Sequence, residues 1–213
     1  MDPISLYCRG LVFWLPPLGF ALIALLALGL HAALPLVGLA ILVRWLFRRP
    51  SPSVPPEPLG MLSPADGRVV GIDQIFDPYL ERECTRVSIR MPRLGPYTTR
   101  GPTEGKVLES LRLEDLEGQI SGGGAARGRV GWIETDEGDR VGVVFHRKGG
   151  LVRPVCVLHV GERIGQGQAC GCIPFGGRVD LLLPVEARVK VSPGQPVRGG
   201  VDALAVIRHE APA

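Results

Sequence analysis

The chain has 213 residues, the length of one domain or of a domain with an appendage, and a net charge of +3. Four arginines and one aspartate in the first fifty residues account for that whole charge, so the rest of the chain is electrically balanced. A balanced body excludes a nucleic-acid-binding protein, because tracking phosphates requires an excess of Lys and Arg. Glycine (29) and proline (20) are frequent, which indicates short strands joined by tight turns.

The first element is an apolar segment, residues 11–43, without a single Asp, Glu, Lys or Arg. It exceeds the ~20 residues of one membrane-crossing helix but is shorter than two crossings with a turn. Pro16, Pro17 and Pro35 therefore predict a bent or re-entrant helical hairpin. A secretory signal peptide and a buried helix pair of a soluble protein are the competing interpretations.

Aromatic and cationic residues at the end of this segment are typical of a membrane interface. They are Arg44, Trp45, Phe47, Arg48 and Arg49. Because positive residues stay cytoplasmic, they predict that the following domain lies on the cytoplasmic side of the inner membrane. We divide the chain into a membrane-associated hairpin (1–50), a stiff proline-rich linker (51–58) and a β domain (59–213).

The body alternates β-rich runs with glycine turns, which predicts a mainly β fold: a barrel or barrel-sandwich hybrid preceded by the helical hairpin. The predicted strands are residues 68–72, 85–89, 130–135, 140–145, 155–160 and 178–183. Residues 109–116 predict one helical turn. Residues 160–168 and 192–200 echo each other, since both run through a turn, an apolar residue and a glycine turn.

Several motifs in this body occur together in one known family. Residues 62–69 read LSPADGRV and residues 175–184 read FGGRVDLLLP. Between them, in order, stand Arg100-Gly-Pro102 with Gly105, Glu134-Thr-Asp136 with Gly138, and Gly150-Leu-Val-Arg153. In these motifs, and in the apolar hairpin before them, the chain resembles the short, membrane-associated bacterial phosphatidylserine decarboxylases over nearly its whole length.

The resemblance implies a prosthetic group made from the chain itself. In that family a serine in a Gly-Ser pair attacks the preceding carbonyl, and elimination then cuts the chain and leaves a pyruvoyl group. That ketone forms an imine with the substrate amine and accepts electrons as carbon dioxide leaves. Here the pair reads Gly176-Gly177, and glycine has no β-carbon for either step. We therefore expect no cleavage at this pair and no cofactor.

A second family position is also substituted. Tyr97 stands where the resemblance implies a histidine suited to proton transfer. A phenol with a pKa of ~10 is a poor general base at pH 7. Asp66 keeps its family position; it is either a catalytic or orienting group or part of an ordinary Ala-Asp-Gly turn, and both interpretations stay open.

Other candidates for chemistry are few. Cys172 follows Gly171 and is the alternative pyruvoyl precursor, against the ordinary interpretation of a buried strand cysteine. His146 and His159 are candidates to replace the missing base, although lone strand histidines are more often packed or on the surface. Cys170 and Cys172 are too close for the usual structural zinc pair, so we expect no metal.

Three functions follow from these residues. The first is a non-catalytic relative that binds membrane phospholipid, phosphatidylserine among them, or that associates with an intact decarboxylase or with itself. The second is an active decarboxylase that converts phosphatidylserine to phosphatidylethanolamine and carbon dioxide through Cys172. The third is a membrane-tethered interaction scaffold.

Overall fold

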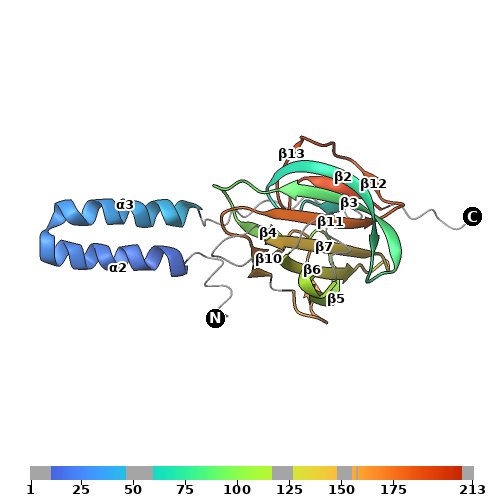
Figure 1. Ribbon diagram of the computed structural model, residues 1–213, viewed down its shortest axis with the longest axis horizontal. Coiled ribbons are helices and arrows are strands. Elements are labelled where there is room, and N and C mark those ends of the chain that lie inside the picture. Colours follow the sequence, from blue (N-terminus) through green and yellow to red (C-terminus); the bar gives the residue numbers. More distant parts are fainter. Residues whose placement is uncertain (1–10, 47–59, 117–126, 148–154, 157, 208–213) are drawn as a thin grey trace, which may run out of the picture.

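The structure is a computed structural model that describes residues 11–46, 60–116, 127–147, 155–156 and 158–207. A pair of helices comes first and a β domain follows (Figure 1). The predicted linker 51–58 and three of the predicted interface residues, Phe47, Arg48 and Arg49, lie outside the described residues.

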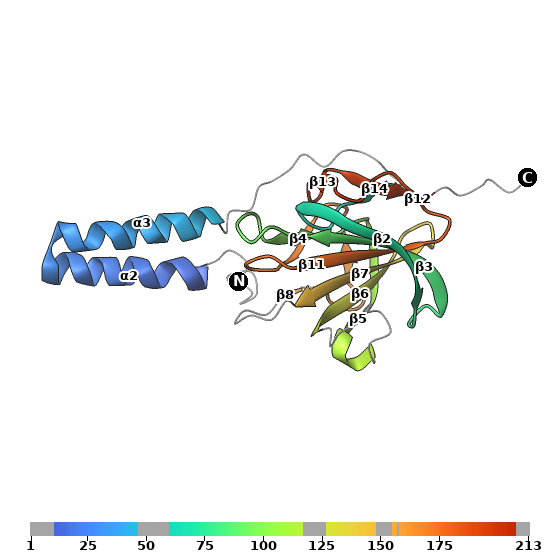
Figure 2. The same ribbon diagram turned by 45° about the horizontal axis from the view of Figure 1, so that its top comes forward.

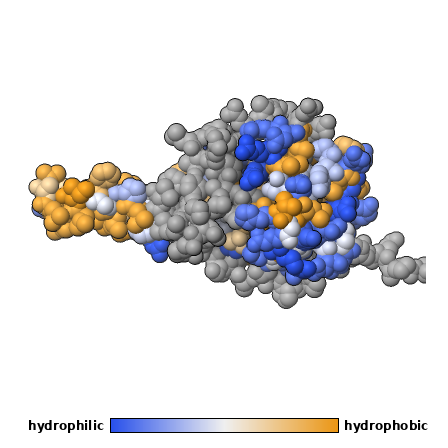
Figure 3. All heavy atoms as spheres, turned by 90° about the horizontal axis from the view of Figure 1, so that it is seen from below, coloured by the Kyte–Doolittle hydropathy of each residue, from blue (hydrophilic) through white to orange (hydrophobic). Residues whose placement is uncertain are grey.

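The helices α2 (Leu11–Leu28) and α3 (Leu30–Leu46) lie side by side as a hairpin, and Gly29, with φ +84°, forms the turn between them. Apolar side chains cover the outside of this pair: Phe20 is 63% and Leu26 is 81% exposed. Figure 3 shows the pair as an almost unbroken apolar surface beside a mixed β domain. Among the described residues, no helix is both long enough and apolar enough to cross a membrane. The predicted hydrophobic helical hairpin is confirmed.

A curled sheet of eight strands forms most of the β domain, in the order β13-β2-β3-β11-β7-β6-β5-β9 (Figure 1). Its strands are β2 (Gly67–Asp77), β3 (Arg82–Arg90), β5 (Gly105–Arg112), β6 (Arg127–Glu134), β7 (Arg140–Arg147), β9 (Arg163–Ile164), β11 (Arg178–Pro184) and β13 (Pro196–Val197). One small sheet joins β1 (Gly60–Leu62), β14 (Ala203–Val206) and β12 (Arg188–Val189); the other joins β4 (Thr98–Arg100), β10 (Ala169–Cys172) and β8 (Val155–Cys156). The mainly β, barrel-like fold is confirmed.

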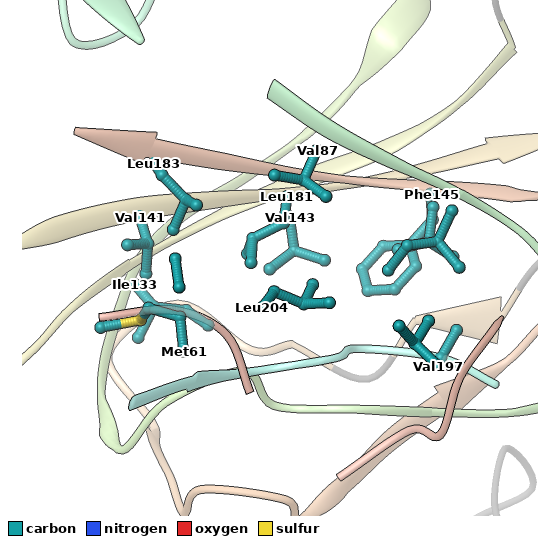
Figure 4. Packing of buried hydrophobic residues seen from close by; sticks show 14 of the residues in the cluster. Met61, Val87, Ile133, Val141, Val143, Phe145, Leu181, Leu183, Val197 and Leu204 are labelled. Carbon is teal, nitrogen blue, oxygen red and sulfur yellow. The ribbon is translucent and has the colours of Figure 1, made fainter. Parts of the chain in front are cut away.

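The two faces of the curled sheet bury different sets of side chains, because successive strand residues point to opposite faces. On the inner face, residues such as Val143, Phe145 and Leu181 pack against Leu204 from the small sheet (Figure 4). On the outer face, Trp132, Val144 and Leu182 form a second cluster that Leu113 covers. Polar residues on the outer face of β11 and β7 therefore stand out, and they are described with the site below.

Most predicted strands are confirmed, but two predictions are wrong. Residues 109–112 continue β5, because their backbone pairs with β6 from Trp132 to Arg129, and only Leu113–Leu116 form a 3-10 turn. The strand predicted over 155–160 ends at Cys156. Leu158–Val160 are not a strand, since the chain turns there and the Glu162 amide donates to the carbonyl of His159.

The predicted echo between residues 160–168 and 192–200 forms the two edges of the sheet. Gly161 and Gly194 both have positive φ, +85° and +90°. Their amides donate to equivalent carbonyls, Gly161 to Val107 and Gly194 to Val69, each at 2.8 Å. The two-residue edge strands β9 and β13 follow these glycines, so the echo marks an approximate twofold repeat in the sheet.

Candidate functional site

The turn after Asp66 and the loops of Tyr97 and Gly177 lie at one end of the β domain, around the end of β3. An added side chain on Gly67 would lie 2.3 Å from the carbonyl oxygen of Arg90, so the turn after Asp66 presses against that strand. On the other side, the Met91 amide donates to Gly177 O at 2.9 Å. The loops that hold residues 91–97 and 173–177 both point toward the side where the helices lie (Figure 2). The turn after Asp66 and the loop of Gly177 therefore flank the end of β3.

The loop at Gly176 and Gly177 is packed for two glycines. Gly176 has φ +80°, and a β-carbon there would lie 2.7 Å from Pro92 O. At Gly177 a β-carbon would lie 2.8 Å from Cγ2 of Ile173 and 3.2 Å from the carbonyl oxygen of His146. A serine at position 177 would thus require the Ile173 side chain to move.

Tyr97 fills the space beside this loop. Only 2% of the residue is exposed, and its hydroxyl donates to the carbonyl of Arg93 at 2.8 Å. Its ring lies 5.8 Å from the ring of Phe175, and its carbonyl accepts the Ile173 amide. Burial raises the pKa of the phenol above its usual value, which moves it further from a general base at neutral pH.

Asp66 is only partly exposed, and burial raises the pKa of its carboxyl group. A hydrogen bond from the backbone of Gly199 and the positive charge of Arg100 act in the opposite direction, while Asp202 adds to the rise. Arg100 itself is buried and donates to Gly167 O at 2.9 Å. A carboxyl held in such surroundings is typical of proton-transfer groups, and a role for Asp66 stays a prediction.

Cys172 lies in a different setting from Gly177. It is the last residue of β10, is 1% exposed, and pairs with Thr98 on one side and Val155 on the other. Gly171 before it is paired in the same way, to Thr99 and Cys156. A thiol attack on the Gly171 carbonyl would have to distort a strand that is hydrogen-bonded along both edges.

A buried polar cluster on the outer face of the sheet was missed by the sequence analysis. Asp180 is fully buried and accepts hydrogen bonds from Nε2 of His146 and from Nε of Arg178, each at 2.6 Å. Arg178 also donates to Oγ of Ser88 at 2.9 Å. Burial alone would raise the pKa of Asp180, but the hydrogen bonds and charges of His146 and Arg178 lower it overall. The alternation in Arg-Val-Asp was the available signal, whereas His146 is brought in by strand pairing 34 residues away.

The two candidate replacement bases do not face the missing β-carbon. The His146 side chain points to the outer face and is bonded to Asp180, whereas a side chain at Gly177 would meet Ile173 of the inner core. His159 is exposed in the turn before the edge strand β9. Neither histidine is placed to serve position 177.

The remaining predicted sites can be placed briefly. The guanidinium of Arg44 lies 5.8 Å above the ring of Trp14, and Trp45 is 54% exposed, so both belong to the surface of the helical pair. Within the described residues, no group of three or more His, Cys, Asp or Glu side chains could hold a metal ion.

Comparison with known proteins adds the following. A family model for phosphatidylserine decarboxylase matches residues 39–205. The chain is 35% identical over 189 residues to a phosphatidylserine decarboxylase proenzyme from Nitrosomonas eutropha, covering 83% of each chain. It is 35% identical over 200 residues to the proenzyme of that name from Burkholderia ambifaria, covering 89% of this chain and 92% of the relative. No solved structure matches.

Proposed function

The chain belongs to the phosphatidylserine decarboxylase family, and from that premise we propose that it is a non-catalytic, membrane-associated member that binds phosphatidylserine without decarboxylating it. The observation that carries the proposal is Gly177 at the position of the self-cleaving serine. The residues present do not fit the family's pyruvoyl group, because the group is made from a hydroxyl-bearing β-carbon and the close approach of Ile173 leaves little room for one.

The substitutions at positions 177 and 97 both support loss of the reaction. Without a hydroxyl at position 177 the ester cannot form, and the elimination that would follow it cannot occur. The peptide bond after Gly176 therefore stays intact. The buried Tyr97 phenol, with its raised pKa, offers no proton acceptor at neutral pH. Both substitutions thus act against the same chemistry.

Binding of the lipid headgroup needs less than catalysis does. A phosphatidylserine headgroup carries an ammonium, a carboxylate and a phosphate. Asp66 supplies a carboxylate at this end of the domain, and Arg90 and Arg178 lie on the neighbouring strands. A carboxylate beside arginines complements an ammonium beside anionic groups, which favours phosphatidylserine over an anionic lipid that has no amine.

The rest of the proposal concerns location and partners. Residues 1–50 hold the β domain (59–213) through the linker 51–58 against the cytoplasmic face of the inner membrane, as the apolar surface of the helical pair supports. An intact decarboxylase or a second copy of this chain is a further proposed partner.

Intact mass tests the loss of self-cleavage. We expect the purified full chain to give a single species near 22.9 kDa. Two fragments, with the second blocked by a carbonyl and beginning at Gly177 or Cys172, would contradict the proposal, and a start at Cys172 would establish the active alternative. The double variant Gly177→Ser with Tyr97→His then asks whether these two substitutions alone account for the loss, because its cleavage would show that the rest of the site is complete.

Vesicle binding tests the headgroup claim. We expect tighter binding to vesicles that contain phosphatidylserine than to vesicles with phosphatidylglycerol at equal surface charge, since any anionic lipid attracts arginines. Asp66→Asn should remove the difference, because it removes the carboxylate that faces the ammonium. Equal binding of the native chain to both vesicles would leave an interaction scaffold as the better description.

A further inference from the structure

Two loops at the site end of the β domain carry exposed apolar side chains. Leu94, in the loop between β3 and β4, is 71% exposed, and Phe175, in the loop between β10 and β11, is 50% exposed. The loops touch, because the Met91 amide bonds Gly177 O and the ring of Phe175 lies 5.8 Å from that of Tyr97. Together they form one apolar rim, defined here by Leu94 and Phe175.

The backbone of Phe175 has a costly conformation. Its φ is +63°, in the left-handed region that non-glycine residues rarely occupy, and Gly176 next to it has φ +80°. Such a conformation costs about 1–3 kcal/mol and often marks functional sites. Here an aromatic ring is kept half-exposed at the tip of a loop, although burying it would stabilise the fold.

A row of like charges lies beside the rim. Arg68, Arg90 and Arg178 are direct neighbours across β2, β3 and β11, and Arg93 is exposed in the loop that carries Leu94. Like charges directly opposite one another destabilise a sheet. Asp180 and Ser88 engage Arg178, and the carbonyl of Gly194 accepts from Arg68. Because the buried carboxylate of Asp180 already balances Arg178, the charges of Arg68, Arg90 and Arg93 are those that favour an anionic partner at this end of the sheet.

Both loops lie at the end of the domain beside which the helical pair projects, as Figures 1 and 2 show from two directions. The apolar surface of the helices and the apolar rim thus fall on the same side of the molecule. Apolar residues flanked by arginines are the composition of segments that lie in the headgroup region of an anionic bilayer.

We propose that the rim of Leu94 and Phe175, with Arg90 and Arg93, is a second membrane-binding surface that inserts into an anionic bilayer. It deepens the proposed function, from which it takes that the helical pair lies at a membrane. With the rim inserted, the loop of Gly176 and Gly177 lies at the lipid headgroups, so a bound phospholipid reaches the site without leaving the bilayer.

Tryptophan quenching by brominated lipid tests the insertion. In full-length chain with Trp14→Phe and Trp45→Phe, only the fully buried Trp132 remains. Phe175→Trp is then compared with Phe76→Trp, a matched control because Phe76 is 53% exposed and lies at the opposite end of β2. In vesicles of acyl-brominated phosphatidylglycerol, we expect the tryptophan at 175 to lose about half of its emission or more and the one at 76 to be unaffected.

Quenching of Trp14 and Trp45 in the unmodified chain, set beside the Phe175→Trp variant, separates insertion of the rim from membrane association of the helices. If Trp14 and Trp45 are quenched but a tryptophan at 175 is not, the rim does not insert and the inference is overturned, while membrane association of the helices stands. If none of them is quenched, the membrane association in the proposed function fails together with the inference. Equal quenching at 175 and 76 also overturns the inference, because it indicates non-specific adsorption.

Charge substitutions test the arginines. In the Phe175→Trp background, Arg90→Gln and Arg93→Gln should each weaken the inserted state in anionic vesicles by about fivefold. Arg140→Gln, at the far end of the sheet, makes the same charge change and should have no effect. An equal loss from Arg140→Gln would show that net charge alone, and not this surface, determines binding.

Discussion

Two turns of the β domain share a backbone arrangement and carry different carboxylates. In the turn Asp66-Gly67-Arg68, a β-carbon on the glycine would lie 2.3 Å from the carbonyl oxygen of Arg90. In the turn Glu104-Gly105-Lys106, the same construction lies 2.3 Å from the carbonyl oxygen of Glu134. The segments before the turns bond each other, from Arg100 N to Pro64 O and from Leu62 N to Pro102 O. The turns are related by the approximate twofold repeat of the sheet and lie at opposite ends of it.

Their carboxylates differ because the surroundings differ. Asp66 is partly buried near the buried Arg100, and its pKa is raised. The side chain of Glu104 is 65% exposed and meets Arg163, also exposed, at 3.6 Å. The turn alone therefore does not make a special carboxyl group. What distinguishes Asp66 is its partial burial, with Gly199, Arg100 and Asp202 around it.

The largest expected effect concerns the glycine contact that the two turns share. Gly67→Ala and Gly105→Ala should each cost about 3 kcal/mol in the free energy of unfolding, because the new methyl group collides with a strand carbonyl that is held by its neighbours. Urea unfolding of both variants measures the loss. We expect the two losses to agree within error, as two copies of one arrangement require.

Gly71→Ala is the matched control, since the nearest atom to an added β-carbon there is Oδ2 of Asp73 at an ordinary 3.5 Å. It should leave stability unchanged or raise it slightly. A large difference between Gly67→Ala and Gly105→Ala, or a loss at Gly71 of the same size, would show that the two turns are not equivalent.

A second test compares the arginine near Asp66 with the arginine near Glu104. Arg100→Met should cost about 2 kcal/mol, because it removes a charged donor from the buried carbonyl of Gly167. It should also raise the pKa of Asp66 further, since the charge of Arg100 now lowers it. Urea unfolding measures the first effect, and NMR titration of the Asp66 carboxyl measures the second.

Arg163→Met is the counterpart at the other end. Arg163 is exposed and pairs with Asp136 at 2.6 Å, in a position where water and salt screen the interaction. No measurable loss of stability is expected. If Arg163→Met destabilised the chain as much as Arg100→Met, the contrast between the partly buried surroundings of Asp66 and the exposed surroundings of Glu104 would be wrong.

The sequence predicts the parts of this fold that depend on local pattern. Alternating runs such as residues 85–89 and 178–183 became β3 and β11, and turn glycines predicted the edge repeat. The prediction of a helical turn at residues 109–112 was wrong, because Glu, Ser, Leu and Arg carry no strong β signal. Pairing with β6 decides their conformation. The predicted strand over 155–160 was wrong for the opposite reason. Its apolar residues carry a strand signal, but Leu158–Val160 form no strand because the chain turns there.

The candidate site shows the same division. Motif order singled out Asp66, Tyr97 and Gly177, and the fold places the loops that carry them around the end of β3. What the sequence could not supply was the burial of Tyr97 or the partners of Asp180, because both arise from strands that are distant in the chain. The equivalence of the Asp66 and Glu104 turns was visible as Pro-x-acid-Gly-basic-Val in both, but only the backbone contacts gave that similarity a meaning.

The smallest expected effect tests the differing part of the comparison directly, through the pH dependence of stability. Because burial raises the pKa of folded Asp66 above its unfolded value, its contribution to stability is complete below the unfolded pKa and is lost as the pH rises through the folded pKa. Asp66→Asn cannot ionise and can still accept the hydrogen bond from Gly199. Its stability relative to the native chain should therefore increase from about pH 4 upward, as urea midpoints across that range would measure.

Glu104→Gln is the counterpart and makes the same chemical change in the equivalent turn. With its side chain 65% exposed, Glu104 is solvated in both the folded and the unfolded chain, so its replacement should give a flat difference in stability across the same pH range. Parallel curves for the two variants would mean that the surroundings of Asp66 impose no cost on its charge. A rise for Asp66→Asn alone would mean that burial at this end of the sheet imposes a cost on the charge of Asp66 that the exposed Glu104 does not bear.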